Sequence, residues 1–167
     1  MKKLFLTLGL VASLASLSLA EEKVVEKGVY NGGEFGVSLG TAYNVKPSAP
    51  FQDPYSLNLV AGVHYFPVKY IGVEANVPFY QTKGVSVDEV QAGLLFRAPI
   101  GHLAPYLGLG PVYNWHSDQS WAYLGKLGLE FRLNSKWSIF TEGQYRENDL
   151  KFDNGEISVK GGIKLNF

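Results

Sequence analysis

The chain has no cysteine, no excess of basic residues and, beyond its first 20 residues, no long hydrophobic run. Without cysteine it can form no disulfide bond and carry no lipid on a thiol. Its 15 basic and 15 acidic side chains balance, so the basic surface that nucleic acids require is missing, and we expect no nucleic-acid partner. Small or polar residues interrupt each apolar stretch every second residue or so, which excludes a membrane-spanning helix of about 20 apolar residues.

The first 20 residues have the layout of a secretory signal peptide. Residues 1–3 include two lysines, residues 4–14 are mostly apolar, and residues 18–20 place small side chains where a signal peptidase cleaves. We expect cleavage after Ala20, which leaves 167 − 20 = 147 residues, a length typical of one domain. The loss of two lysines leaves 13 basic and 15 acidic side chains, a net charge near −2.

Eight segments after residue 33 alternate with a period of two, apolar on one face and mostly small or polar on the other. The predicted strands are residues 34–43, 56–66, 70–80, 88–98, 105–115, 121–133, 137–146 and 156–167. Each is about as long as a tilted strand must be to cross a bilayer. Pro78 and Pro111 each remove a ladder donor, which indicates a bulge or a strand end at these positions.

Aromatic residues gather at both ends of the predicted strands, which is the pattern that the two interfaces of a bilayer select. One group is Tyr43, Trp115, Trp121 and Tyr145, and the other is Tyr65, Tyr70, Phe96, Phe131, Trp137 and Phe167. A secreted lipocalin also has eight up-and-down strands, but its apolar residues point inward. The polar face here is mostly Gly, Ser, Asn and Gln, and residues 34–38 lack the Gly-x-Trp signature associated with lipocalins. The pattern therefore favours apolar side chains that face a membrane.

With this strand pattern, the two aromatic belts and the terminal Phe167, the chain resembles the small eight-stranded bacterial outer-membrane β-barrels of the OmpA transmembrane-domain or OmpX type. The resemblance implies an all-β, eight-stranded, antiparallel up-and-down transmembrane β-barrel over residues 34–167, preceded by a short periplasmic segment, 21–33. It also implies a monomer in the outer membrane of a diderm bacterium, with outer-membrane lipids and the barrel assembly machinery as partners. The family's assembly signal is a closing strand with Phe last, which corresponds here to Phe167, Leu165 and Ile163.

If the polar face is internal, its charged side chains are confined to the lumen of the barrel. They are Glu74, Arg97, Lys126, Glu130, Arg132, Glu142, Arg146, Lys160 and Lys164. Counting from the tight turn at residues 134–136 places Glu142 opposite Gly128. Glu142 is then expected to reach Lys126 on one side and Lys160 or Lys164 on the other. Opposite charges on neighbouring strands attract, and each neutralises a group that is costly to bury alone.

We also expect Glu74 to pair with Arg97 across the third and fourth strands. Such pairs have two interpretations, either a static polar core that fills a narrow barrel or a gate whose pairs exchange partners and admit ions. The sequence favours the static core.

Catalysis, cofactor binding and metal binding find no support in the sequence. Lipid A-modifying barrels exist, and a deacylase of this architecture would place His and Ser two residues apart on one strand face. His116 and Ser117 are adjacent, so alternation sends them to opposite faces. We therefore expect no enzyme and no cofactor, but a structural or envelope-integrity role. The alternatives are a narrow gated pore and surface recognition through the loops near residues 44–55, 81–87, 116–120 and 147–155.

Overall fold

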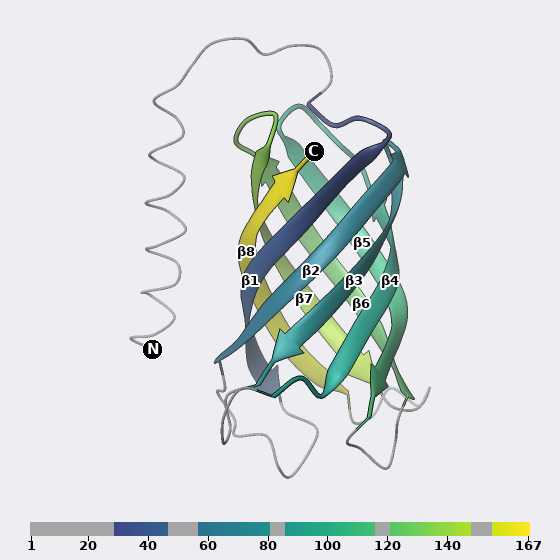
Figure 1. Ribbon diagram of the computed structural model, residues 1–167, viewed down its shortest axis with the longest axis vertical. Coiled ribbons are helices and arrows are strands. Elements are labelled where there is room, and N and C mark those ends of the chain that lie inside the picture. Colours follow the sequence, from purple (N-terminus) through teal and green to yellow (C-terminus); the bar gives the residue numbers. More distant parts are fainter. Residues whose placement is uncertain (1–28, 47–56, 81–85, 116–120, 148–154) are drawn as a thin grey trace.

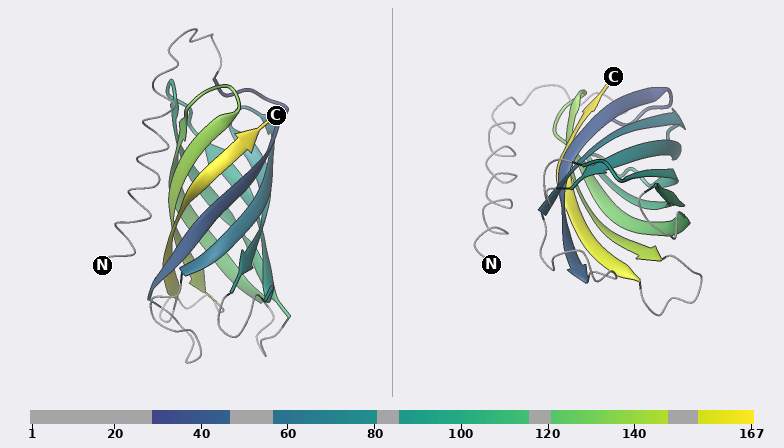
Figure 2. Two further views of the ribbon diagram at one scale, coloured as in Figure 1. Left: turned by 60° about the vertical axis from the view of Figure 1, so that its left-hand side comes forward. Right: turned by 60° about the horizontal axis from the view of Figure 1, so that its bottom comes forward.

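The computed structural model describes residues 29–46, 57–80, 86–115, 121–147 and 155–167, and these form a closed barrel of eight antiparallel strands in chain order. The strands are β1 (Glu34–Lys46), β2 (Leu57–Val68), β3 (Ile71–Phe79), β4 (Glu89–Arg97), β5 (Leu103–Asn114), β6 (Trp121–Arg132), β7 (Trp137–Glu147) and β8 (Glu156–Asn166). β8 pairs with β1 and closes the ring, and all strands are inclined to the barrel axis (Figures 1 and 2). The predicted fold is confirmed.

Several sequence predictions concern residues outside the described ranges. The signal peptide over residues 1–20, most of the 21–33 segment and the greater part of the four longer loops belong to this group. Among the residues that the structure does describe, no helix is both long enough and apolar enough to span a membrane.

The strand boundaries match the predicted ones to within three residues, and the differences have local causes. β2 runs on to Val68 because its pairing with β3 shifts register between Tyr65 and Val68, where Pro67 lacks a ladder donor. The turn that follows is therefore at Lys69 and Tyr70, whereas the predicted strands left residues 67–69 between them.

Pro78 and Pro111 interrupt the sheet in different ways. Pro78 lies beyond Asn76, the last residue of β3 that pairs with β4, and so marks the end of that ladder. Pro111 lies inside β5, where the β4–β5 pairing skips two positions and resumes without a change of register. A β-carbon on Gly110, next to Pro111, would collide with the Ala92 carbonyl oxygen of β4. The expected bulge at Pro111 is therefore a gap in an unshifted ladder.

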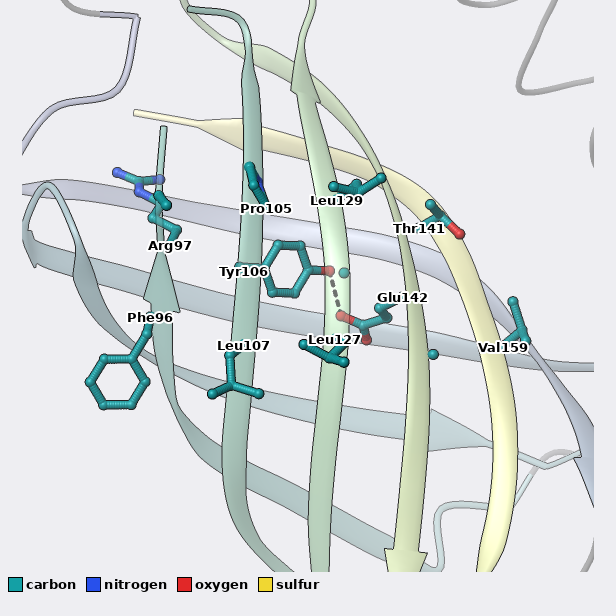
Figure 3. Close-up of a pocket in the computed structure, with 13 residues that line it drawn as sticks. Phe96, Arg97, Pro105, Tyr106, Leu107, Leu127, Leu129, Thr141, Glu142 and Val159 are labelled. Carbon is teal, nitrogen blue, oxygen red and sulfur yellow. Dashed lines mark hydrogen bonds between the residues drawn. The ribbon is translucent and has the colours of Figure 1, made fainter. Parts of the chain in front are cut away.

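Apolar side chains point outward and polar side chains point into the barrel. Along β6, for example, Leu127 is 68% exposed while its neighbour Lys126 is 4% exposed. Figure 3 shows the same division: Phe96, Leu107 and Val159 point away from the lumen, whereas Tyr106 and Glu142 meet inside it. Apolar surface facing outward all round a barrel requires a lipid solvent, so the lipocalin alternative is wrong.

The lumen is not entirely polar, in contrast to the interior of small and polar residues that the sequence suggested. Phe66, Leu95 and Tyr106 form one buried apolar cluster, and Val112, Ala122 and Leu124 form a second. Glycines make room for the larger side chains, because a β-carbon on Gly128 would collide with the Tyr106 ring. The interior is a packed core of mixed polarity.

The two ends of the barrel differ. At one end, called the turn end, the chain reverses through residues 69–70, 98–102 and 133–136, and the C-terminus lies there (Figure 1). The other end, called the loop end, carries the longer connections. Bacterial outer-membrane barrels have short periplasmic turns and longer extracellular loops, so the resemblance implies that the turn end faces the periplasm.

Candidate functional site

The centre of the lumen is organised around Glu142, which is 3% exposed. Lys126 Nζ and Lys160 Nζ each lie 3.3 Å from a different carboxylate oxygen of Glu142. The Tyr106 hydroxyl donates to Glu142 Oε2 at 2.5 Å, and Gln144 Nε2 donates to Oε1 at 2.7 Å. Four donors therefore satisfy a charge that would otherwise be very costly to bury.

The register places these residues side by side. Glu142 lies opposite Gly128 on β6, as counted from the turn, and opposite Lys160 on β8. Lys126 Nζ also contacts Glu74 on β3. The central cluster, defined as Glu74, Lys126, Glu142, Lys160 and Tyr106, thus connects β3 with β5, β6, β7 and β8 through the middle of the lumen.

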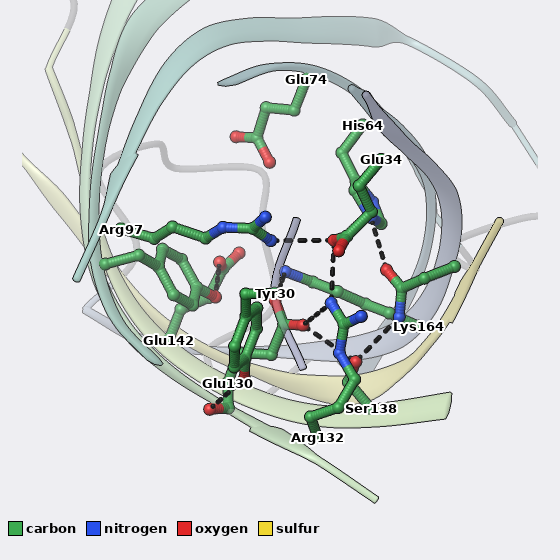
Figure 4. A network of polar contacts seen from close by, with 12 residues as sticks. Tyr30, Glu34, His64, Glu74, Arg97, Glu130, Arg132, Ser138, Glu142 and Lys164 are labelled. Atoms are coloured by element: carbon green, nitrogen blue, oxygen red, sulfur yellow. Dashed lines mark hydrogen bonds and ion pairs between the residues drawn. The ribbon is translucent and has the colours of Figure 1, made fainter. Parts of the chain in front are cut away.

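A second cluster fills the lumen at the turn end, and Glu34 is one of its two anions (Figure 4). Glu34 Oε1 lies 2.8 Å from Arg97 Nη1 and 2.8 Å from Arg132 Nη2. Arg97 also binds the barrel backbone, since its Nε donates to the Lys69 carbonyl oxygen at 2.7 Å. The Arg97 guanidinium also covers the Phe66 ring at 3.7 Å from its centroid.

Glu130 is the second anion of this turn-end cluster. Lys164 Nζ lies 2.8 Å from Glu130 Oε2, and the Ser138 hydroxyl donates to Oε1 at 2.8 Å. Arg132 Nη2 reaches Glu130 Oε1 at 3.3 Å, so Arg132 links the two anions. Its Nε atom is buried without a hydrogen-bond partner.

Tyr30 completes the turn-end cluster, although it precedes β1. Its hydroxyl lies 3.0 Å from the His102 carbonyl oxygen and 3.2 Å from that of Glu130. Burial raises the pKa of Tyr30, so the phenol stays protonated and acts as a donor. The part of the N-terminal segment that enters β1 therefore packs into the barrel mouth and does not trail away from it.

A third cluster lies at the loop end. Arg146 Nη1 is 2.5 Å from Glu89 Oε2, and Gln91 Nε2 donates to Glu89 Oε1 at 2.9 Å. Glu156 on β8 is the ladder partner of Arg146. The three clusters follow one another along the barrel, so charged pairs occupy the lumen from one end to the other.

The expected pair between Glu74 and Arg97 is wrong. Glu74 lies opposite Gly93, and Arg97 is four positions further along β4, beside the turn at Tyr70. The ladder therefore holds the two side chains at different levels of the lumen, and each finds another partner, Lys126 for Glu74 and Glu34 for Arg97. Lys164 likewise binds Glu130, which leaves Lys126 and Lys160 as the cations that contact Glu142.

Among the ionisable members of the three clusters, five were missing from the sequence-based set of interior charges. They are Tyr30, Glu34, Glu89, Tyr106 and Glu156. Alternation already places Glu34 on the same face as Gly36, and Glu89 on the same face as Gln91, so the signal for these two was present. Tyr30 lies outside the alternating segments, and no sequence pattern points to it.

The residues of the expected assembly signal lie on the outer face of β8 and at its end. Ile163 pairs with Leu39, and Leu165 pairs with Val37 of β1. Phe167 is 69% exposed and stacks on Phe35, with ring centroids 6.3 Å apart. Its backbone N–H donates to the Phe35 carbonyl oxygen at 2.7 Å, so the last residue takes part in barrel closure.

The histidines that the structure describes serve the scaffold. His64 Nε2 donates to Asn166 Oδ1 at 3.0 Å inside the lumen, and His102 Nδ1 donates to the Arg132 carbonyl oxygen at 2.8 Å. His116 lies outside the described residues. Within the described ranges, no group of three His, Asp or Glu side chains is arranged to hold a metal ion.

Outward apolar surface, a lumen of paired charges and short turns at one end together define a bacterial outer-membrane barrel. The sequence profile described as outer membrane protein beta-barrel domain matches residues 6–167. The chain therefore belongs to this family, and it is a protein of the bacterial outer membrane.

Similar solved structures share the fold at low sequence identity. The N-terminal β-barrel domain of Pseudomonas aeruginosa OprF is 13% identical, with 82% of this chain and 99% of that chain covered and a TM-score of 0.63. OprG from the same organism is 15% identical, with 83% and 97% covered and a TM-score of 0.54. Yersinia pestis Ail in a phospholipid nanodisc is 18% identical, with 81% and 100% covered and a TM-score of 0.52. Comparison with curated proteins gave no match.

Proposed function

We propose that this protein is a closed structural barrel that supports the integrity of the outer membrane and does not conduct ions. The observation that carries the proposal is the central cluster, in which one buried carboxylate holds two lysines and a tyrosine across the lumen. In this proposal the barrel is a monomer, its apolar wall binds outer-membrane lipids, and the assembly machinery recognises its last strand.

The physical argument concerns what an ion would have to displace. An eight-stranded barrel leaves an interior just wide enough for side chains. Passage past Glu142 requires Lys126 or Lys160 to leave the buried carboxylate, and separating opposite charges that are shielded from water is costly. Glu142 also holds the Tyr106 ring, which fills the space above Gly128. The closed arrangement is thus favoured over an open one by several contacts at once.

The test is the ion conductance of the purified, refolded barrel in a planar bilayer. We expect no stepwise conductance from the parent chain. Thr141→Val is the matched control, because Thr141 precedes Glu142 on β7 and points outward. Stepwise conductance in both the parent and the control would overturn the structural proposal.

A narrow gated pore is the second candidate, and the shared carboxylates favour it. Glu34 lies between Arg97 and Arg132, and Glu142 lies between Lys126 and Lys160. An anion with two cations can exchange partners without ever being left unpaired. Conductance in the parent that changes in Glu142→Gln but not in Thr141→Val would support this second function. Recognition through the loops concerns residues that the structure mostly does not describe.

A further inference from the structure

Tyr30 lies in the turn-end mouth of the barrel, and its position there is unusual for a residue outside the strands. It is 2% exposed. β1, which follows it, stands opposite β5 in the ring of eight strands. The Tyr30 hydroxyl nevertheless lies within hydrogen-bond distance of carbonyl oxygens of His102, just before β5, and of Glu130 on β6. The chain therefore crosses the mouth before it enters the wall.

The Tyr30 ring lies close to two cations that come from different strands. The guanidinium carbon of Arg97 lies 4.9 Å from the ring centroid, and that of Arg132 lies 4.4 Å from it. Both arginines are fixed by Glu34, which begins β1. Cation–π attraction is strongest where the groups are desolvated, as they are here. Figure 4 shows Tyr30 among these side chains in the lumen.

The backbone on either side of the turn into β1 is also attached to the barrel. Arg97 Nη2 donates to the Asn31 carbonyl oxygen at 3.1 Å, and Gly33 N donates to the Phe66 carbonyl oxygen at 2.8 Å. Gly33 adopts φ +79°, a left-handed conformation that turns the chain from the mouth into β1 and that favours glycine. The ring and the backbone are thus attached by separate contacts.

We propose that residues 29–33, with Tyr30 as the side chain that fills the mouth, form a stopper that closes the periplasmic end of the lumen. The Tyr30 stopper separates periplasmic water from the turn-end cluster, whose Ser138 is 0% exposed. Removal of the ring would admit water and small solutes as far as Glu130 and Arg132. The stopper is a device of the chain itself, and it acts whether or not the central cluster conducts.

The test uses single cysteines, which report without background because the chain has none. Ser138→Cys places a thiol just inside the stopper, and Ser158→Cys places one in the lumen near the loop end, on β8. Each cysteine substitution is made in three backgrounds, namely the parent with Tyr30, Tyr30→Ala and Tyr30→Phe. The barrels are reconstituted in lipid nanodiscs, which leave both ends of the barrel open to solvent. The readout is the rate of reaction with a small cationic thiol reagent. The gel shift between unheated and heated samples confirms that each variant is folded.

We expect Tyr30→Ala to raise the labelling rate at position 138 by about tenfold or more. The cation–π and hydrogen-bond contacts of Tyr30 stabilise the closed mouth, so their loss raises the fraction of molecules in which the thiol at position 138 is open to the reagent. The rate at position 158 should not change. Tyr30→Phe keeps the ring and loses the hydroxyl, so a smaller rise in the labelling rate at position 138 is expected. If Tyr30→Ala does not fold, the labelling rate of Tyr30→Phe serves as the test of the stopper.

Two results would overturn the stopper. One is an unchanged rate at position 138 in every folded Tyr30 variant, and the other is an equal rise at positions 138 and 158, which means general loosening of the barrel. Conductance of the parent chain plays no part in this test, so its outcome is separate from that of the structural proposal.

Discussion

Replacing Glu142 by Gln tests the central cluster directly, because the change removes one charge and almost no volume. Lys126 keeps Glu74 as a counter-charge. Lys160 loses the carboxylate that it contacts directly and keeps Asn76 Oδ1 at 3.4 Å, so its buried ammonium is left with no described ion pair. The glutamine oxygen can still accept from Tyr106. Breaking one partner of a buried pair costs about 3–5 kcal/mol, and we expect the free energy of unfolding to fall by about 3 kcal/mol, the low end of that range.

The assay is urea unfolding of the barrel in phospholipid vesicles, followed by fluorescence of its three tryptophans. Thr141→Val is again the matched control, and it should change stability by less than about 0.5 kcal/mol. A double-mutant cycle then isolates the pair. Lys160→Met alone should destabilise the barrel, since it leaves Glu142 with one cation fewer. In the Glu142→Gln background the same change should be neutral or stabilising, because it removes the unpaired charge.

A refuting result is equally specific. If Glu142→Gln loses less than about 0.5 kcal/mol, and if Lys160→Met costs the same in both backgrounds, then the two groups are not coupled. Water in the lumen would then screen the charges, and the structural barrier to ion passage would lose its basis.

Three further predictions concern the last strand, the wall and the mouth. Phe167→Ser should lower the membrane-inserted fraction in cells more than the refolding yield in detergent, and equal losses would mean that Phe167 matters only as packing on Phe35. Gly110→Ala should cost about 1–3 kcal/mol in urea unfolding, because the new β-carbon meets the Ala92 backbone, whereas Gly143→Ala, with no atom within 4 Å of the new β-carbon, should cost almost nothing. Burial raises the pKa of Tyr30, so its contribution to stability is complete below the ordinary tyrosine value of about 10 and is lost as the pH rises toward the higher folded value. Above pH about 10 the parent should therefore lose stability more steeply than Tyr30→Phe, and parallel pH profiles would contradict a buried phenol.

The fold could be predicted from the sequence because each strand carries its own evidence. Alternation with period two, strand length and aromatic ends all depend on local residues, and they place each strand within three residues. The position of Glu142 opposite Gly128, and with it the contact with Lys126, was also predictable, because the tight turn at residues 134–136 fixes the register of β6 and β7. Register counted across a short turn leaves little freedom.

Contacts that cross the lumen could not be predicted in the same way. Glu74 and Arg97 lie on neighbouring strands that are joined by a long connection. Counting residues across that connection does not fix the register, so the relative heights of the two side chains along the barrel axis could not be predicted. Lys126 reaches Glu74 through the lumen rather than along the wall, and no sequence spacing encodes that distance. Tyr30 shows the limit most clearly, because its burial depends on a turn at Gly33 and on partners about 70 and 100 residues away.

The inverted burial of this barrel has a consequence for how its sequence can diverge. A lipid solvent makes the same demand at every outward position, so Leu127 or Val159 can be exchanged for almost any apolar residue, one at a time. The lumen follows the opposite rule, because Glu142, Lys126 and Glu74 share partners, and a change at one requires a compensating change at another. Relatives should therefore drift freely on their lipid-facing surface, while their interiors change in linked groups of residues.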